Sequence, residues 1–210
     1  YLFFIVILGL PVMMTEMSLG RKTRHDPVQA YADIDPHAKI VGIFGVMAAF
    51  VILSYYSVIG GWIIKYIISY GTTLAAPADF TMFISSNEPV ICHFVFMAIT
   101  TAICFFGISG IEKASKFMMP LLFVLLIVII VRSVTLPGAS EGLRFIFSPE
   151  GSGFSLGSVS AALGQVFYSL SLCMGITITY GSYLSEKENI PKSCLSVAGL
   201  DTAIAILAGI

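Results

Sequence analysis

The chain has 210 residues, of which 57% are hydrophobic and only 11% are charged, and its formal net charge is −1. A mean hydropathy of +0.95 excludes an ordinary soluble domain and is typical of a membrane protein with several spans. The balanced charge gives no reason to expect a nucleic-acid partner. We therefore predict an all-α polytopic membrane protein that lies in the lipid bilayer.

Six hydrophobic segments define the expected helices, and a spanning helix needs about 20 residues. They form a single transmembrane domain and cover residues 1–19, 40–70, 89–106, 117–133, 154–184 and 192–210. Most Lys and Arg residues lie in the loops after the first, third and fifth segments. Because basic loops stay in the cytoplasm, we expect the chain to enter the membrane from outside.

Both ends of the sequence lie in apolar runs. Tyr1 begins within a hydrophobic segment with no signal-peptide pattern, and Ile210 ends within another. We expect an internal fragment, preceded in the intact protein by an odd number of spans, most simply one.

The first segment contains an acid, Glu16, a few residues before the basic cluster Arg21–Arg24. One interpretation places this carboxylate at the membrane interface, paired with the cluster. The other makes it a functional acid within the membrane that bonds a neighbouring helix. The segment itself leaves both open.

The second segment places Ile52 and Tyr56 four residues apart, on one helix face. A buried tyrosine hydroxyl needs a partner, either another helix or a ligand, and the spacing leaves both open. In the next stretch, residues 107–116 are predicted to form a tight cytoplasmic turn before the helix at 117–133. His93 is predicted to be structural, and the four cysteines to be buried thiols rather than metal ligands.

The fifth segment is interrupted in its middle, between Ser169 and Gly175. Serines offer the backbone alternative hydrogen bonds, and glycine costs roughly 1 kcal/mol relative to alanine inside a helix. Backbone freed from a helix is tolerated in a membrane where protein buries it or where it lines a polar cavity. We expect a helix broken near residues 171–175 that forms a binding site, with an intact helix packed through small residues as the alternative.

The last segment contains Asp201 with no basic residue within one helical turn. A carboxylate at this depth needs a proton, a cation or a buried partner. A cation site built from Asp201, the Ser169 hydroxyl and Gln165 suits a hard cation, which prefers oxygen ligands. A proton-binding carboxylate is the alternative.

Several motifs together resemble the neurotransmitter:sodium symporter family, particularly its bacterial amino-acid transporters with the LeuT-type fold. They occur in the family's order and extend over nearly the whole chain: GLPVMMTEMSLGR at 9–21, SYYSVIGGW at 54–62, GIEKASKFMMP at 110–120, QVFYSLSLCMGITITYGSYL at 165–184 and LDTAIAILAG at 200–209. The resemblance implies that the six segments are helices two to seven of twelve.

The resemblance also implies roles for residues of the amino-acid site. Tyr56 matches the tyrosine that binds the substrate carboxylate, Ile52 matches an apolar wall, and Tyr168 matches the aromatic residue that closes the pocket from outside. The unwound part of the sixth helix would shape the pocket through Ser169, Ser171, Cys173, Met174 and Gly175. Because Cys173 and Met174 replace a glycine and a bulkier residue, we expect an apolar or aromatic amino acid as substrate.

Ion sites follow from the same resemblance. Ser169 and Asp201 match sodium ligands, and Glu16 matches the acid that braces the unwound backbone. Chloride-dependent members hold chloride near the positions of Tyr1, Gln165, Ser169 and the seventh helix. Because Asp201 would itself supply a negative charge there, we expect transport that does not require chloride.

The function implied is sodium-coupled symport of amino acids by alternating access, in a plasma membrane and most simply a bacterial inner membrane. A proton-coupled carrier that uses Asp201 and a non-transporting amino-acid sensor on the same fold are the alternatives. An enzyme is not expected, because His93 has no serine or cysteine partner at a comparable depth.

Overall fold

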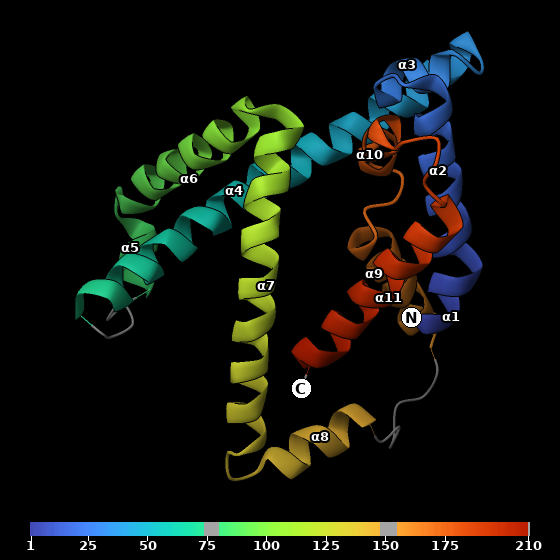
Figure 1. The fold of residues 1–210 in the computed structure, drawn as a ribbon. Helices are drawn as coiled ribbons and strands as arrows, with labels where there is room; N and C mark the ends of the chain where they lie inside the picture. Colours follow the sequence, from blue (N-terminus) through green and yellow to red (C-terminus); the bar gives the residue numbers. More distant parts are fainter. Residues whose placement is uncertain (74–79, 148–154, 210) are drawn as a thin grey trace. The chain divides into compact units, whose positions relative to one another are not determined.

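The computed structural model describes residues 1–73, 80–147 and 155–209, and every regular element within these ranges is helical (Figure 1). The chain divides into two compact units. One consists of Tyr1–Ala49 with Leu125–Ile210, and the other of Phe50–Val124. The predicted all-α class is confirmed.

The first helical run comprises α1 (Leu2–Phe4), a π-helical turn η1 (Ile5–Gly9) and α2 (Leu10–Thr23). Pro11 lies at the start of α2 and has no N–H to donate to the preceding turn, which explains why the helix widens there. The run ends at Arg24, whose φ of 59° is left-handed.

The loop that follows contains α3 (Pro27–Ala32) and a 3₁₀ turn, η2 (Pro36–Ala38). Asp26 starts α3, because its side chain accepts hydrogen bonds from the backbone N–H groups of Val28 at 2.9 Å and Gln29 at 3.2 Å. Proline suits the first position of a helix, where no N–H is required. The predicted cytoplasmic connection is therefore an ordered element.

The long helices are α4 (Lys39–Thr73), α6 (Glu88–Phe105) and α7 (Gly107–Val134), and the short helices α5 (Phe80–Ser85) and α8 (Ala139–Phe147) lie between or after them. The predicted turn at residues 107–116 is wrong, because α7 already begins at Gly107. The chain changes direction between α6 and α7 at Gly107, whose φ is 61°. Glu112 and Lys116 then form an ion pair at spacing i, i+4, which supports a helix.

The fifth predicted segment is divided into α9 (Leu156–Ser169) and α10 (Ile176–Tyr183), and α11 (Ile190–Gly209) follows. Its predicted first residue, 154, lies outside the described residues. Within the part of the chain that the structure describes, five helical stretches are long and apolar enough to cross a membrane, namely 2–23, 36–72, 88–105, 107–134 and 190–209. The pieces α9 and α10 are each too short, which is the expected consequence of a broken span.

The unit that contains the break is packed around α2 and α10. A Cβ built on Gly20 would collide with the carbonyl oxygen of Ile178, and one on Gly181 would lie 2.5 Å from the carbonyl oxygen of Met17. Small residues of this kind let two membrane helices approach at backbone distance. The residues buried around them include Met13, Val166, Leu172, Ile178 and Cys194.

The other unit is packed around α4 and α6. A Cβ on Gly60 would lie 2.5 Å from the Phe96 ring, and one on Gly61 would lie 2.8 Å from the His93 backbone nitrogen. An ion pair of 2.5 Å joins Lys65 to Glu88 at the start of α6. The His93 backbone thus lies against α4.

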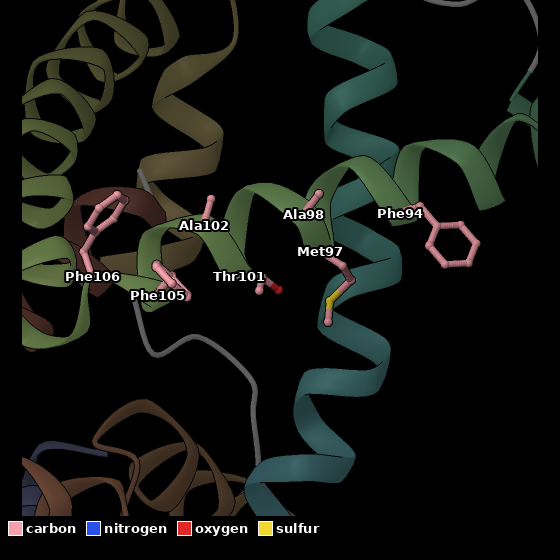
Figure 2. A pocket seen from close by; sticks show the side chains of 7 residues that line it. All are labelled: Phe94, Met97, Ala98, Thr101, Ala102, Phe105 and Phe106. Atoms are coloured by element: carbon pink, nitrogen blue, oxygen red, sulfur yellow. The ribbon is translucent and has the colours of Figure 1, made fainter.

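A shallow groove of about 660 Å³ runs along α6 (Figure 2). Its lining contains one polar side chain, that of Thr101, and is otherwise apolar: Phe94, Met97, Ala98, Ala102, Phe105 and Phe106. Such a lining offers no charged group to an amino-acid zwitterion. The candidate site is therefore located by its polar contacts, in the other unit.

Candidate functional site

The break between α9 and α10 is built from left-handed backbone. Ser171, Cys173 and Gly175 have φ values of 53°, 61° and 72°, and a left-handed residue other than glycine costs about 1–2 kcal/mol. Local hydrogen bonds tie the chain to the end of α9, including one of 2.9 Å from the Leu172 N–H to the Phe167 carbonyl. Leu172, 1% exposed, anchors the break in the apolar core.

Glu16 of α2 meets this break directly. Its side chain is buried, and the carboxylate accepts a hydrogen bond of 3.0 Å from the Cys173 backbone N–H and another from the Thr177 hydroxyl. These two donors compensate part of the cost of removing the carboxylate from water. They also attach the unwound backbone and the first turn of α10 to α2.

The basic cluster near Glu16 has other partners. Arg21 donates to the carbonyl oxygen of Glu188 at 2.8 Å, and Arg24 donates to those of Ser182 at 2.9 Å and Leu184 at 2.6 Å. Cationic side chains are favourable near the last carbonyls of a helix. The Arg24 guanidinium therefore holds the end of α10, the Arg21 guanidinium holds the loop before α11, and Glu16 faces the break.

A second polar cluster joins the first and last helices of this unit to the end of α9. The Tyr1 hydroxyl lies 3.2 Å from Ser169 Oγ and donates to Asp201 Oδ2 at 3.1 Å. The Ser169 hydroxyl also donates to Asp201 Oδ2. Three oxygen-bearing side chains thus converge at the point where α9 stops.

The chemistry of this cluster suits a hard cation. Two neutral hydroxyls donate to one carboxylate oxygen, Oδ2 of Asp201, which leaves acceptor sites on the other oxygen and the negative charge uncompensated. Each hydroxyl keeps lone pairs that can turn to a metal ion. Within the described residues no three His, Cys, Asp or Glu side chains gather as for a transition metal, whereas carboxylate and hydroxyl oxygens fit sodium.

The remaining predicted site residues have varied positions. Gln165 and Tyr168 are exposed on α9, Cys173 is exposed in the break, Ser171 and Met174 are partly buried, and Gly175 is buried. Ile52 and Tyr56 lie in the other unit, so their parts in a common pocket stay predictions. Tyr56 is 48% exposed, and its ring centroid lies 5.2 Å from that of Tyr55.

The loop element α3 packs against α2, the helix that carries Glu16. Burial raises the pKa of Tyr31, and the negative charge of Glu16 raises it further. At the end of α3, Asp33 bonds His25 Nδ1 at 2.8 Å. That hydrogen bond, followed by one from Gln29, lowers the pKa of Asp33.

Thr177 was not predicted as a functional residue. Its spacing of four residues from Cys173 would place both on one face of a continuous helix, but residues 173–175 are not helical, so this spacing is no guide to the contact. Its contact with Glu16 depends on the approach of α2 to α10.

A many-span helical protein with one helix broken beside a buried acid, and with a carboxylate-hydroxyl cluster at the break, belongs to the class of membrane transporters with discontinuous helices. The sequence model of the Sodium:neurotransmitter symporter family matches residues 1–88 and 84–210. The chain is a member of that family, as the motifs predicted.

Relatives and solved structures agree with this assignment. An uncharacterized sodium-dependent transporter of Bacillus subtilis, YhdH, is 36% identical over all of this chain and 49% of its own length. The human sodium- and chloride-dependent transporter XTRP3 is 25% identical, over all of this chain and 42% of its length. The crystal structure of MhsT in complex with L-phenylalanine is 42% identical with a TM-score of 0.87, over all of this chain and 50% of that one.

The chain therefore spans about half the length of the proteins it matches. The structural similarity confirms the LeuT-type fold, including its broken helix. The family is one of sodium:neurotransmitter symporters, which are transporters rather than enzymes.

Proposed function

We propose that the full-length protein is a sodium-coupled symporter of amino acids that works by alternating access. The observation that carries the proposal is the convergence of Tyr1, Ser169 and Asp201 beside the break. Sodium binds the Ser169 and Asp201 oxygens, and the amino acid binds the adjacent unwound backbone of residues 171–175. Each sodium ion that enters down a membrane potential of 100 mV, negative inside, adds about 2.3 kcal/mol of driving force, roughly a 50-fold concentration ratio.

The proposed substrate is an apolar or aromatic amino acid. Tyr168 and Met174 supply apolar surface beside the break, and methionine adapts to irregular ligands. The complex of the similar MhsT with L-phenylalanine supports the same class. Ile52 forms a wall of the pocket, and Tyr56 binds the substrate carboxylate.

Chloride is proposed not to be required, because Asp201 supplies the negative charge that chloride would otherwise bring. The relative XTRP3 is described as sodium- and chloride-dependent, so the proposal sets this chain apart from that relative. We also place the protein in a plasma membrane, that of a bacterium in the simplest case.

Proteoliposomes that contain the full-length protein test the proposal. Labelled L-phenylalanine and L-leucine should accumulate under an inward sodium gradient, should fail to accumulate when choline replaces sodium, and should still accumulate when gluconate replaces chloride. Uptake driven by a proton gradient without sodium would favour the proton-coupled alternative through Asp201. Saturable binding without accumulation would favour an amino-acid sensor.

A further inference from the structure

The unwound backbone at residues 173–175 is contacted by two residues that have no part in the ion cluster, Pro27 at the start of α3 and Gly45 of α4. A second glycine of α4, Gly42, packs behind Pro27. We call these three residues the backing surface. All of them belong to the same compact unit as the break.

Pro27 lies directly against Gly175. Both residues are buried, and a Cβ built on Gly175 would lie 2.7 Å from Cγ and 2.8 Å from Cβ of Pro27. No side chain fits between them. Since Gly175 also has a φ of 72°, the contact holds a backbone conformation that other residues rarely adopt.

The two glycines bring α4 against the same structure. A Cβ on Gly45 would lie 3.2 Å from the Cys173 carbonyl oxygen and 3.3 Å from the Gly175 backbone nitrogen. A Cβ on Gly42 would lie 2.6 Å from the Pro27 carbonyl oxygen. The start of α3 is thus packed against both α4 and the break.

The orientation of Pro27 is fixed from within its own loop. The Asp26 side chain caps α3 through the N–H groups of Val28 and Gln29, and such caps typically contribute about the free energy of one hydrogen bond. The rest of α3 also packs against α2 and α10, the two helices that hold the Glu16 brace.

We propose that Pro27, Gly42 and Gly45 are positioning residues for the substrate site, so that α3, an element of a loop expected in the cytoplasm, sets the affinity of a site within the membrane. The inference rests on the proposed function in one respect, namely that the 171–175 backbone binds the amino acid. Preorganised backbone groups bind a ligand more tightly because less ordering is required on binding. Glu16 holds the N–H of Cys173, and the backing surface holds the residues that follow.

Hydrogen exchange in the full-length protein without substrate tests the positioning itself. In Pro27→Ala, amides of residues 171–179 should exchange about fivefold faster than in the unmodified protein, because local opening becomes easier. Pro36→Ala, in the same loop at the start of η2 and exposed, is the matched control and should leave them unchanged. Unchanged exchange in Pro27→Ala, or acceleration spread equally over α9, α10 and α11, overturns the proposal.

Uptake kinetics test the consequence for the substrate. With labelled L-phenylalanine, Pro27→Ala should raise KM about tenfold with little change in the maximal rate, as expected for a loss of ground-state binding. Pro36→Ala should behave like the unmodified protein. If KM is unchanged while exchange accelerates, the backing surface does not set affinity and the proposal fails.

A double-mutant cycle tests the contact between Pro27 and Gly175. The methyl group added in Gly175→Ala collides with the proline ring, and Pro27→Gly removes that ring. If the two changes were independent, the fold-losses in affinity of the single variants would multiply in the double variant. Because the collision is relieved, the loss in the double variant should be at least about fivefold smaller than that product. If the fold-losses in affinity of the two single variants simply multiply in the double variant, the contact between Pro27 and Gly175 is contradicted. If the unmodified protein takes up no amino acid, the proposed function fails, whereas the hydrogen-exchange result still decides the positioning.

Discussion

The hydroxyl of Tyr1 donates a hydrogen bond to the carboxylate of Asp201 at 3.1 Å, although 200 residues separate them in the chain. Ser169 Oγ lies 3.2 Å from the same hydroxyl. The contact joins the beginning of the first helical run to α11 at the point where α9 stops. It places one formal negative charge among hydroxyl groups, which is the basis of the proposed sodium site.

Replacing Asp201 by asparagine should separate its two proposed roles. The side chain keeps an oxygen for sodium but loses its charge, so the apparent sodium affinity should fall about tenfold, equivalent to roughly 1.4 kcal/mol. Added chloride should then restore part of the uptake, because it supplies the missing charge. Uptake at varied sodium, with chloride or gluconate, measures both effects.

The control for this variant is Asp35→Asn, which removes an exposed loop carboxylate and should change neither dependence. If Asp201→Asn has the same sodium affinity as the unmodified protein and does not respond to chloride, the carboxylate takes part in neither ion site.

Glu16→Gln should weaken both folding and transport. The carboxamide presents an N–H group toward a site that holds two donors, the Cys173 N–H and the Thr177 hydroxyl. A buried donor left without an acceptor costs about 1–3 kcal/mol. Thermal unfolding of the purified protein and amino-acid uptake should both show the loss.

Thr177→Val identifies which donor causes that loss. It removes one donor with little change in shape, so its effect should be smaller, and Glu16→Gln should cost less in the Thr177→Val background than alone. Glu112→Gln alters an exposed pair with Lys116 and is the control. Equal losses for Glu16→Gln and Glu112→Gln would be inconsistent with a brace at the break.

The sequence was most informative where chemistry and local backbone preference coincide. Serines and glycine between Ser169 and Gly175 predicted the break, because these residues weaken a helix wherever it lies. The isolated charge of Asp201 predicted a polar site, because a carboxylate within the membrane needs a proton, a cation or a buried partner. The turn predicted at residues 107–116 was wrong, because glycine and alternating charges are compatible with both a turn and the first turns of a helix.

Contacts between distant segments could not be predicted from the residues alone. The choice of Glu16 between the basic cluster and the break depends on where α10 lies, and the family resemblance, not the spacing, favoured the break. Pro27 had no signal beyond a loop proline. Its contact with Gly175 exists because α2, α3 and α4 bring the loop that contains Pro27 against the unwound backbone.

The loop carries a pH-dependent contact between His25 and Asp33. The His25 hydrogen bond lowers the pKa of Asp33 from its usual value of 3.8. A depressed carboxyl pKa contributes stability above the unfolded value, and this stability is lost as the pH falls below about 3.8 through the lowered value. Unfolding midpoints between about pH 2 and pH 5 should therefore change less steeply in Asp33→Asn than in the unmodified protein. Identical pH profiles would show that the contact has no effect on stability.

The left-handed backbone at Cys173 leads to a prediction about which of two substitutions at this position gives the more stable protein. Cys173 has a φ of 61°, where glycine is unstrained and alanine is not. Cys173→Gly should therefore be more stable than Cys173→Ala by about 1 kcal/mol, after both have lost the same thiol.

Cys194 provides the matched control because it lies within α11. In a helix interior glycine is about 1 kcal/mol less favourable than alanine, so Cys194→Gly should be less stable than Cys194→Ala. Thermal unfolding of the four variants measures both differences. If the Gly variant is the more stable one at residue 173 and the Ala variant is the more stable one at residue 194, the break exists in the protein before any ligand binds. The same order at both sites would mean that residue 173 is helical without substrate, and that binding itself unwinds the helix.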